Sequence, residues 1–422
     1  MVLTISGVPL GDGVKLLRQN APELTWHDRS PFLGAVAAAV IPWLRIAHRD
    51  HRRETDLELP EEPVAPQGFA VSFAPEDGNG AHAWAAAEGL RLLAADPAAV
   101  ARAADKITSL ALFAQAGART PRTWVVDGEL PAAATVPLVV QRRANNLTGK
   151  GTRLVTTPRQ LDDVLCEWSG ETLRVSAHVD GIAVTVSGCV TRSGTVVSAL
   201  SHQLVGIPAL TPYWGAHCGN QLIADDVLPP GAAHRCREVC ARVGDRLNEL
   251  GFLGAFGLDL LVTPEAEVLA IEINPRFQTV VSLVQAQERA AGLLPTLGTH
   301  ALATLVPSLP VEAVRTPHLE LSQLVVTADR TGVLGRGVET GVHRLEAGRL
   351  RHTGQGDLVA LRPGEALLWA HARPGDAVRP GEELALLQLP APAASVAPAP
   401  ELTAEAREWV RAVRRAVVVG DV

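Results

Sequence analysis

The chain of 422 residues carries a formal net charge of −7, with 38 Lys and Arg residues against 45 Asp and Glu residues. This balance argues against a nucleic-acid-binding surface, and no long apolar run predicts a membrane span. The N-terminus has no basic region typical of a secretory signal, and five scattered cysteines predict reduced thiols in a cytoplasmic protein. We therefore expect no nucleic-acid and no membrane partner, while a homodimer stays open.

Residues 1–100 predict a small α/β domain. Apolar runs at 2–6 and 69–74 are typical of strands, and residues 82–94 have the apolar spacing of a helix. Residues 96–126 predict two helices and a strand, because Asp96 can cap the first helix ahead of Pro97 and Gly117 can end the second.

Residues 101–315 form the predicted central domain. A strand near 136 leads into the polar loop "NNLTGKG" at 145–151, and a second strand leaves it. A meander of strands is predicted between 170 and 200, with turns at Asp180-Gly181 and Ser193-Gly194. A long amphipathic helix at 229–251 then precedes a hairpin at 254–277.

Residues 316–390 predict a small β-rich domain, because short apolar runs alternate with glycine-bearing turns. We expect this domain to cap the site formed by the central domain. Residues 391–422 predict a linker rich in Pro and Ala and a terminal helix at 403–418. The chain as a whole is predicted to have an α+β fold.

The hairpin carries an unusual set of polar side chains. Glu272, Asn274 and Arg276 are spaced by two and therefore share one face of a strand, and Asp259 on the preceding strand can come opposite them. Two carboxylates and an amide oxygen are ligands that suit Mg²⁺ bound together with substrate phosphates. A salt bridge between Arg276 and Glu272 is the structural alternative.

The order of these elements resembles the ATP-grasp superfamily over roughly residues 100–310. The hairpin pattern of an acidic residue followed by Glu-x-Asn-x-Arg is the most specific part of the resemblance. It implies a fold in which two α+β subdomains sandwich a nucleotide, with ATP and one or two Mg²⁺ ions as cofactors. By resemblance, Asp259, Glu272 and Asn274 are the metal ligands, and Arg276 neutralises charge on the transferring phosphoryl group.

The resemblance also implies a nucleotide site. Lys106 matches a lysine that reaches the nucleotide phosphates, and Gly149, Lys150 and Gly151 lie in a loop that closes over them. Only three lysines occur in the chain, at 15, 106 and 150. This rarity favours a functional role for Lys150, and we expect Lys150 and Arg276 to be the catalytic residues. Two positions depart from the family pattern. Gln141 stands at a position where the family often has a second lysine. Ser176 stands at a position where the family usually has a glutamate. Ser176 and His178 both belong to the hinge that, by resemblance, contacts adenine.

The implied reaction is that of an ADP-forming ligase, which activates a carboxylate as an acyl phosphate and couples it to an amine. The domain layout is similar to that of pheganomycin-type peptide ligases, which favours small-molecule or peptide substrates in natural-product biosynthesis. His217 and Asn220, in the polar loop at 211–222, are the candidate substrate contacts.

Two other functions stay open. The first is a bicarbonate-using ligase of the biotin-carboxylase or purine-pathway type, although Val280 stands where biotin carboxylases continue into a glutamate. No lysine follows Lys150, so the β-rich segment cannot carry biotin or lipoate. The second is a non-catalytic nucleotide-binding module, which the departures at Gln141 and Ser176 favour and the complete hairpin set disfavours.

Overall fold

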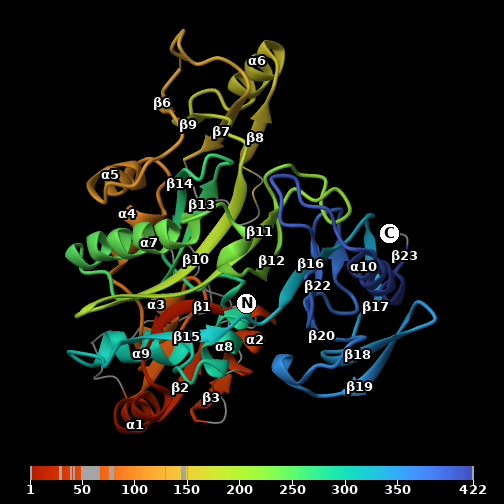
Figure 1. Ribbon diagram of the computed structural model, residues 1–422. Helices are drawn as coiled ribbons and strands as arrows, with labels where there is room; N and C mark the ends of the chain where they lie inside the picture. The colour runs from red at the N-terminus through yellow and green to blue at the C-terminus, as the bar shows by residue number, and fades with distance from the viewer. Residues whose placement is uncertain are drawn as a thin grey trace.

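The computed structural model describes residues 2–27, 31–38, 40, 43–48, 67–75, 80–128, 130–143, 149 and 151–420, and shows a mixed α+β molecule (Figure 1). The longest sheet has ten strands and runs through the middle of the molecule. No helix in these ranges combines the length and the apolar character that crossing a membrane requires. All five cysteines fall within them and are free thiols.

The N-terminal part contains a four-stranded parallel sheet in the order β3-β2-β4-β5. Its elements in chain order are α1 (Leu10–Asn20), β2 (Glu23–Trp26), α2 (Pro31–Ala38), β3 (Arg45–His48), β4 (Phe69–Val71), α3 (Ala81–Ala87) and β5 (Arg91–Leu92). The first strand, β1 (Val2–Gly7), instead pairs with β15 (Glu312–Pro317), which lies almost at the other end of the central part. The predicted helix at 82–94 is too long, because the chain turns at Gly89 with a φ of +64° and continues as β5.

A small four-stranded sheet in the order β6-β9-β7-β8 lies at the top of Figure 1 with α6 (Pro158–Glu167) beside it. The strands are β6 (Thr123–Val126), β7 (Leu138–Arg142), β8 (Thr152–Val155) and β9 (Leu173–Ala177). Two helices precede it, α4 (Pro97–Ala104) and α5 (Thr108–Gln115). As predicted, Asp96 accepts hydrogen bonds from the first turn of α4, and Gly117 follows α5 with a φ of +61°.

The ten-stranded sheet has the order β14-β13-β10-β11-β12-β16-β22-β20-β18-β19. Its first five strands are β10 (Ile182–Thr191), β11 (Gly194–Val205), β12 (His217–Leu222), β13 (Gly254–Val262) and β14 (Val268–Asn274). The long helix α7 (Ala232–Glu249) packs on β10 and β11 through buried residues such as Val243 and Leu247. Two further helices, α8 (Val281–Ala290) and α9 (Thr296–Leu305), follow the hairpin.

The predicted meander between 170 and 200 is partly wrong. β10 and β11 do form a hairpin, but β9 pairs with β6 and β7 in the small sheet. Residues 178–181 therefore cross from one sheet to the other. This crossing places residues of β9 and the start of β10 on opposite sides of the same space.

The C-terminal strands continue the central sheet. They are β16 (Ser322–Thr327), β18 (Gly341–Glu346), β19 (Arg349–Gly354), β20 (Glu365–Ala370) and β22 (Glu383–Leu389), and β16 pairs directly with β12. A separate three-stranded sheet consists of β17 (Gly332–Arg336), β21 (Ala377–Val378) and β23 (Val418–Gly420). Because the sheet crosses the boundary drawn at residue 315 without a break, the domain limits stay predictions.

The segment predicted as a linker is packed against the sheet. Ala393 and Ala394 are buried, and their backbone N–H groups both donate to Gln221 Oε1. The backbone oxygen of Ala394 accepts from Gln221 Nε2. The terminal helix α10 (Ala404–Ala416) begins at Thr403, whose side chain accepts from the backbone N–H of Ala406, and buries Trp409. The Pro- and Ala-rich segment is therefore packed as part of the folded protein and does not act as a spacer before α10.

Candidate active site

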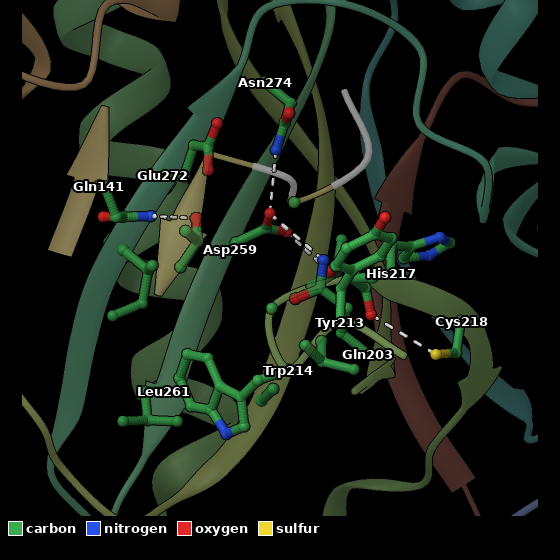
Figure 2. A pocket seen from close by; sticks show the side chains of 18 of the residues that line it. Gln141, Gln203, Tyr213, Trp214, His217, Cys218, Asp259, Leu261, Glu272 and Asn274 are labelled. Carbon is green, nitrogen blue, oxygen red and sulfur yellow. Dashed lines mark hydrogen bonds between the residues drawn. The ribbon is translucent and has the colours of Figure 1, made fainter. Parts of the chain in front are cut away.

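A cavity of about 650 Å³ is lined by residues from both the small sheet and the ten-stranded sheet. Figure 2 shows several of its polar side chains converging from different strands. Every predicted site residue that the structure describes lines this cavity: Lys106, Gln141, Gly149, Gly151, Ser176, His178, His217, Asn220, Asp259, Glu272, Asn274 and Arg276. Lys150 lies outside the described residues.

The hairpin of β13 and β14 positions the acidic residues. Asp259 and Glu272 are directly opposite in the strand register, so their side chains share one face as predicted. Asn274 donates to Asp259 through Nδ2 at 3.0 Å, and its Oδ1 accepts from Arg276 Nη2 at 3.2 Å. The ion-pair partner of Glu272 is Lys106, with Nζ 2.5 Å from Oε1, rather than the Arg276 of the structural alternative.

The two carboxyl groups have opposite electrostatic settings. Burial alone would raise the pKa of Glu272, but the adjacent Lys106 ammonium lowers it, and Glu272 is held ionised. Burial and the nearby charge of Glu272 raise the pKa of Asp259. Asp259 is surrounded by neutral donors, with Thr185 Oγ1 at 2.8 Å and Gln278 Nε2 at 3.2 Å from its Oδ1. A cation between the facing carboxylates would relieve the repulsion that raises the pKa of Asp259.

This donor set fits magnesium. Two carboxylates and an amide oxygen that can accept a second bond are hard oxygen ligands, and Mg²⁺ commonly takes the rest of its octahedron from water and substrate phosphates. Within the part of the chain that the structure describes, no group of three or more His, Cys, Asp or Glu side chains could hold a metal ion. The arrangement therefore suits an ion that arrives with a phosphate ligand better than a metal enclosed by protein alone.

The small sheet supplies the opposite wall of the cavity. Gln141 on β7 is paired in register with Arg174 on β9, and Val139 with Ser176, so these four residues face the same side. Gln141 Nε2 donates to Thr152 Oγ1 at 3.3 Å. Figure 2 shows this contact beside the carboxylates of the hairpin.

Gly149 lies against Gly215, and both residues line the cavity. Gly149 has a φ of +69°, and a Cβ there would lie 2.2 Å from the carbonyl oxygen of Gly215. Only glycine meets both conditions, because it tolerates the left-handed conformation and the close backbone approach. Nearby, the rings of His178 and Trp214 lie 6.0 Å apart, and Trp214 remains 45% exposed. These two rings border the crossing segment at 178–181.

The predicted substrate contacts form one cluster. His217 Nε2 lies 2.8 Å from Asn220 Oδ1 and 3.2 Å from Thr279 Oγ1. An amide oxygen can only accept, so Nε2 carries the proton and donates to Asn220. Burial lowers the pKa of His217, which keeps the ring neutral. The cluster can therefore bind a substrate by hydrogen bonding without adding a charge to the cavity.

The C-terminal strands complete the wall, as expected for a part that caps the site. β16 contributes Val325 and Thr327, β22 contributes Glu383, and Pro398 comes from the packed segment. Glu383 Oε2 lies 2.8 Å from His371 Nδ1, a contact that holds its carboxylate in place. Residues more than a hundred positions beyond the hairpin thus shape the same space.

Sequence reasoning missed several residues of the cavity: Arg174, Thr185, Gln203, Gln278 and Thr279. For Gln278 a signal was present, since it continues the two-residue spacing of 272, 274 and 276 beyond the end of β14. Its amide also needs Gly257, where a Cβ would overlap the amide oxygen. For Arg174 the charge itself was misleading, because an arginine on a strand usually faces solvent.

The comparisons with known proteins agree on the architecture. Residues 103–280 match a family model described as an ATP-grasp domain. None of the curated proteins compared with the sequence matches it. Among solved structures, a biotin carboxylase in complex with β,γ-ATP from Campylobacter jejuni has a TM-score of 0.60 at 11% identity, covering 96% of this chain and 93% of that chain.

Two further solved structures are similar over nearly their whole lengths. An L-amino acid ligase from Bacillus licheniformis has a TM-score of 0.59 at 11% identity, over 96% of this chain and 99% of that chain. An N5-carboxyaminoimidazole synthase from Aspergillus clavatus, in complex with ADP and 5-aminoimidazole ribonucleotide, has a TM-score of 0.57 at 9% identity, over 93% and 97%. Sequence identities this low support a shared fold and do not by themselves assign a function. The chain has the ATP-grasp fold, and its residues 103–280 match the ATP-grasp domain model.

Proposed function

We propose that the protein is an ATP-dependent, ADP-forming ligase that activates a carboxylate as an acyl phosphate and couples it to an amine. One observation supports this proposal most directly: a single cavity brings together the candidate metal ligands and two cations. The ligands are Asp259, Glu272 and Asn274, the cations are Lys106 and Arg276, and all of them fall in the region that matches the ATP-grasp model. A non-catalytic nucleotide-binding module would have no need for both a metal-ligand set and two cations beside it.

Each residue has a defined part in this proposal. Asp259, Glu272 and Asn274 would hold Mg²⁺, which supplies positive charge to the nucleotide phosphates when bound. Lys106 keeps Glu272 ionised and is itself directed into the cavity. Arg276, which Asn274 orients through a hydrogen bond, can stabilise charge that develops on the transferring phosphoryl group.

The nucleotide and the acyl substrate would occupy different parts of the cavity. The hinge at 176–179 and the glycine-bearing loop around Gly149 and Gly151 border one part. Lys150 belongs to that loop in sequence and is proposed to act on the same phosphates. The neutral cluster of His217, Asn220 and Thr279 borders the other part and is proposed to contact the acyl substrate.

An amide-forming reaction is preferred over bicarbonate chemistry because of Val280. This residue lines the cavity and is 1% exposed, so an apolar side chain stands where the resemblance to biotin carboxylases leads one to expect a glutamate. A bicarbonate-using enzyme needs polar groups that bind and deprotonate a small anion. We further propose that the enzyme is a peptide or amino-acid ligase of natural-product biosynthesis. The support for this finer assignment is the order of the domains along the chain.

The test is ADP release with ATP and Mg²⁺ in the presence of pools of amino acids and short peptides, with and without bicarbonate. We expect release that requires both a carboxylate and an amine, and a product whose mass is their sum less water. E272Q is the control for contaminating ATPases. ADP release that depends on bicarbonate and needs no amine would replace the proposal by a carboxylase.

A further inference from the structure

Arg174 is a buried cation that the roles described above leave unused. It lies on β9 and is 1% exposed, which places it among the largest fully buried side chains of the described residues. A buried guanidinium is costly unless its donors are satisfied and its charge is balanced. Burial accordingly lowers the pKa of Arg174, and the charge of Glu272 opposes that effect.

The hydrogen bonds of Arg174 are incomplete. Nη1 donates to the backbone oxygen of Ile271 at 2.7 Å, which joins β9 of the small sheet to β14 of the large one. Nε is fully buried and has no hydrogen-bond partner among the described residues. Arg174 also lines the cavity, so its guanidinium borders the proposed nucleotide site with its donors only partly used.

The charges around Arg174 favour an anion. Glu272 interacts with three cations, Lys106, Arg174 and Arg276, and its single negative charge is already engaged by Lys106 at 2.5 Å. On the small sheet, the side chain paired with Arg174 across the strands is Gln141, which brings no charge. Among the described residues of this wall, the guanidinium therefore lacks a full counter-charge.

We propose that Arg174 binds the phosphate groups of the nucleotide and supplies the positive charge that Gln141 does not provide on this wall of the cavity. The inference rests on the proposed function, since it assumes that the cavity takes a nucleotide. A guanidinium suits this role because its planar donors match phosphate oxygens and its charge persists when it is buried. The bond to Ile271 orients the side chain.

The test is isothermal titration calorimetry of the full chain with ATP, ADP and adenosine in the presence of Mg²⁺. We expect R174M to weaken ATP and ADP binding by about tenfold or more, the scale of one lost charge-assisted contact, and to leave adenosine binding unchanged. R142M is the matched control, because the neighbouring Arg142 on β7 pairs with Glu171 and is half-exposed. It should bind all three ligands as the wild type does.

A second variant separates charge from structure. Gln141 lies opposite Arg174 on the same face, so Q141K in the R174M background places a cation beside the lost one and should restore most of the ATP affinity. Should R174M not fold, R174Q removes the charge but keeps a hydrogen-bond donor, and it should show the same loss, confined to ATP and ADP.

The outcomes distinguish this inference from the proposed function. Unchanged ATP affinity in R174M, or an equal loss for adenosine, overturns the role of Arg174 and leaves it a structural bridge to Ile271. A wild-type protein that binds none of the three ligands contradicts the proposed function itself, and the inference about Arg174 with it.

Discussion

Glu272 is the residue on which the charges of the cavity converge. Lys106, Arg174 and Arg276 all lower its pKa against the opposing effect of burial, and Asp259 faces it across the hairpin. A carboxylate held ionised at neutral pH in a buried position is available as a metal ligand without first losing a proton. This is the property that a magnesium-dependent phosphoryl transfer requires.

We expect E272Q to reduce kcat for ADP formation by roughly a hundredfold or more, because the amide would remove a charged ligand of the proposed metal site. Circular dichroism should show the fold intact, since the amide still accepts a hydrogen bond from Lys106. E267Q is the matched control, as Glu267 lies at the turn of the same hairpin, is partly exposed and pairs with Arg119. A normal kcat in E272Q would remove Glu272 from the metal site.

Lys106 has a separate expected effect. Lys106 is 4% exposed and lines the cavity, where the proposed phosphates would lie. K106M should raise the KM for ATP by about tenfold, the effect of losing one contact to a charged group, as measured by initial rates of ADP release. K15M, which changes an exposed lysine of α1, serves as the control. An unchanged KM in K106M would show that the lysine only orients Glu272.

At the scale of elements, the hairpin could be predicted and β9 could not. The two-residue spacing of Glu272 and Asn274 is local, and their strand partners lie 13 and 17 positions upstream across one short turn, which sets the register. β9 pairs with β7, whose partner residues lie 31 to 39 positions away, and no local pattern encodes that choice. Arg174 was missed for the same reason, since its buried setting depends on this pairing.

The start of α9 has a buried acidic partner on α8. Glu288 accepts from the backbone N–H and the hydroxyl group of Thr296 and from the hydroxyl group of Ser198. Burial raises the pKa of Glu288 from its ordinary value of 4.5 to about 7 in spite of these bonds. The folded protein therefore binds this proton more tightly than the unfolded chain does.

Stability should decrease as pH rises through this window. A carboxyl whose pKa is raised on folding contributes fully below its unfolded pKa, and the contribution is lost as pH increases from about 4.5 to about 7. The expected loss is at most roughly 3 kcal/mol, from 1.36 kcal/mol per pKa unit. Urea midpoints at pH 5 and pH 8 measure it, and the wild type should lose more than E288Q. Equal losses in the two proteins would contradict a raised pKa.

At the scale of the whole molecule, β16 and β22 join two cores. Leu324 and Leu387 face the cluster that contains Trp409 of α10, while Val325 and Leu386 face the cluster that contains Trp26 of the N-terminal sheet. This alternation follows from the strand period of two. Val325 also lines the cavity. The terminal helix α10 therefore packs on one face of β16 and β22, and a residue on the other face of β16 borders the site.

We therefore expect W409A to destabilise the protein by about 3–5 kcal/mol, because it would leave a cavity where a side chain 1% exposed now packs. R411A, on the exposed side of the same helix, should change stability by less than about 0.5 kcal/mol. Urea unfolding followed by circular dichroism measures both. If W409A unfolds like the wild type, α10 is an independent appendage. The other outcome is that W409A is destabilised and also loses ATP affinity at urea concentrations at which it is still folded. In that case, the packing of α10 on β16 and β22 affects the geometry of the cavity.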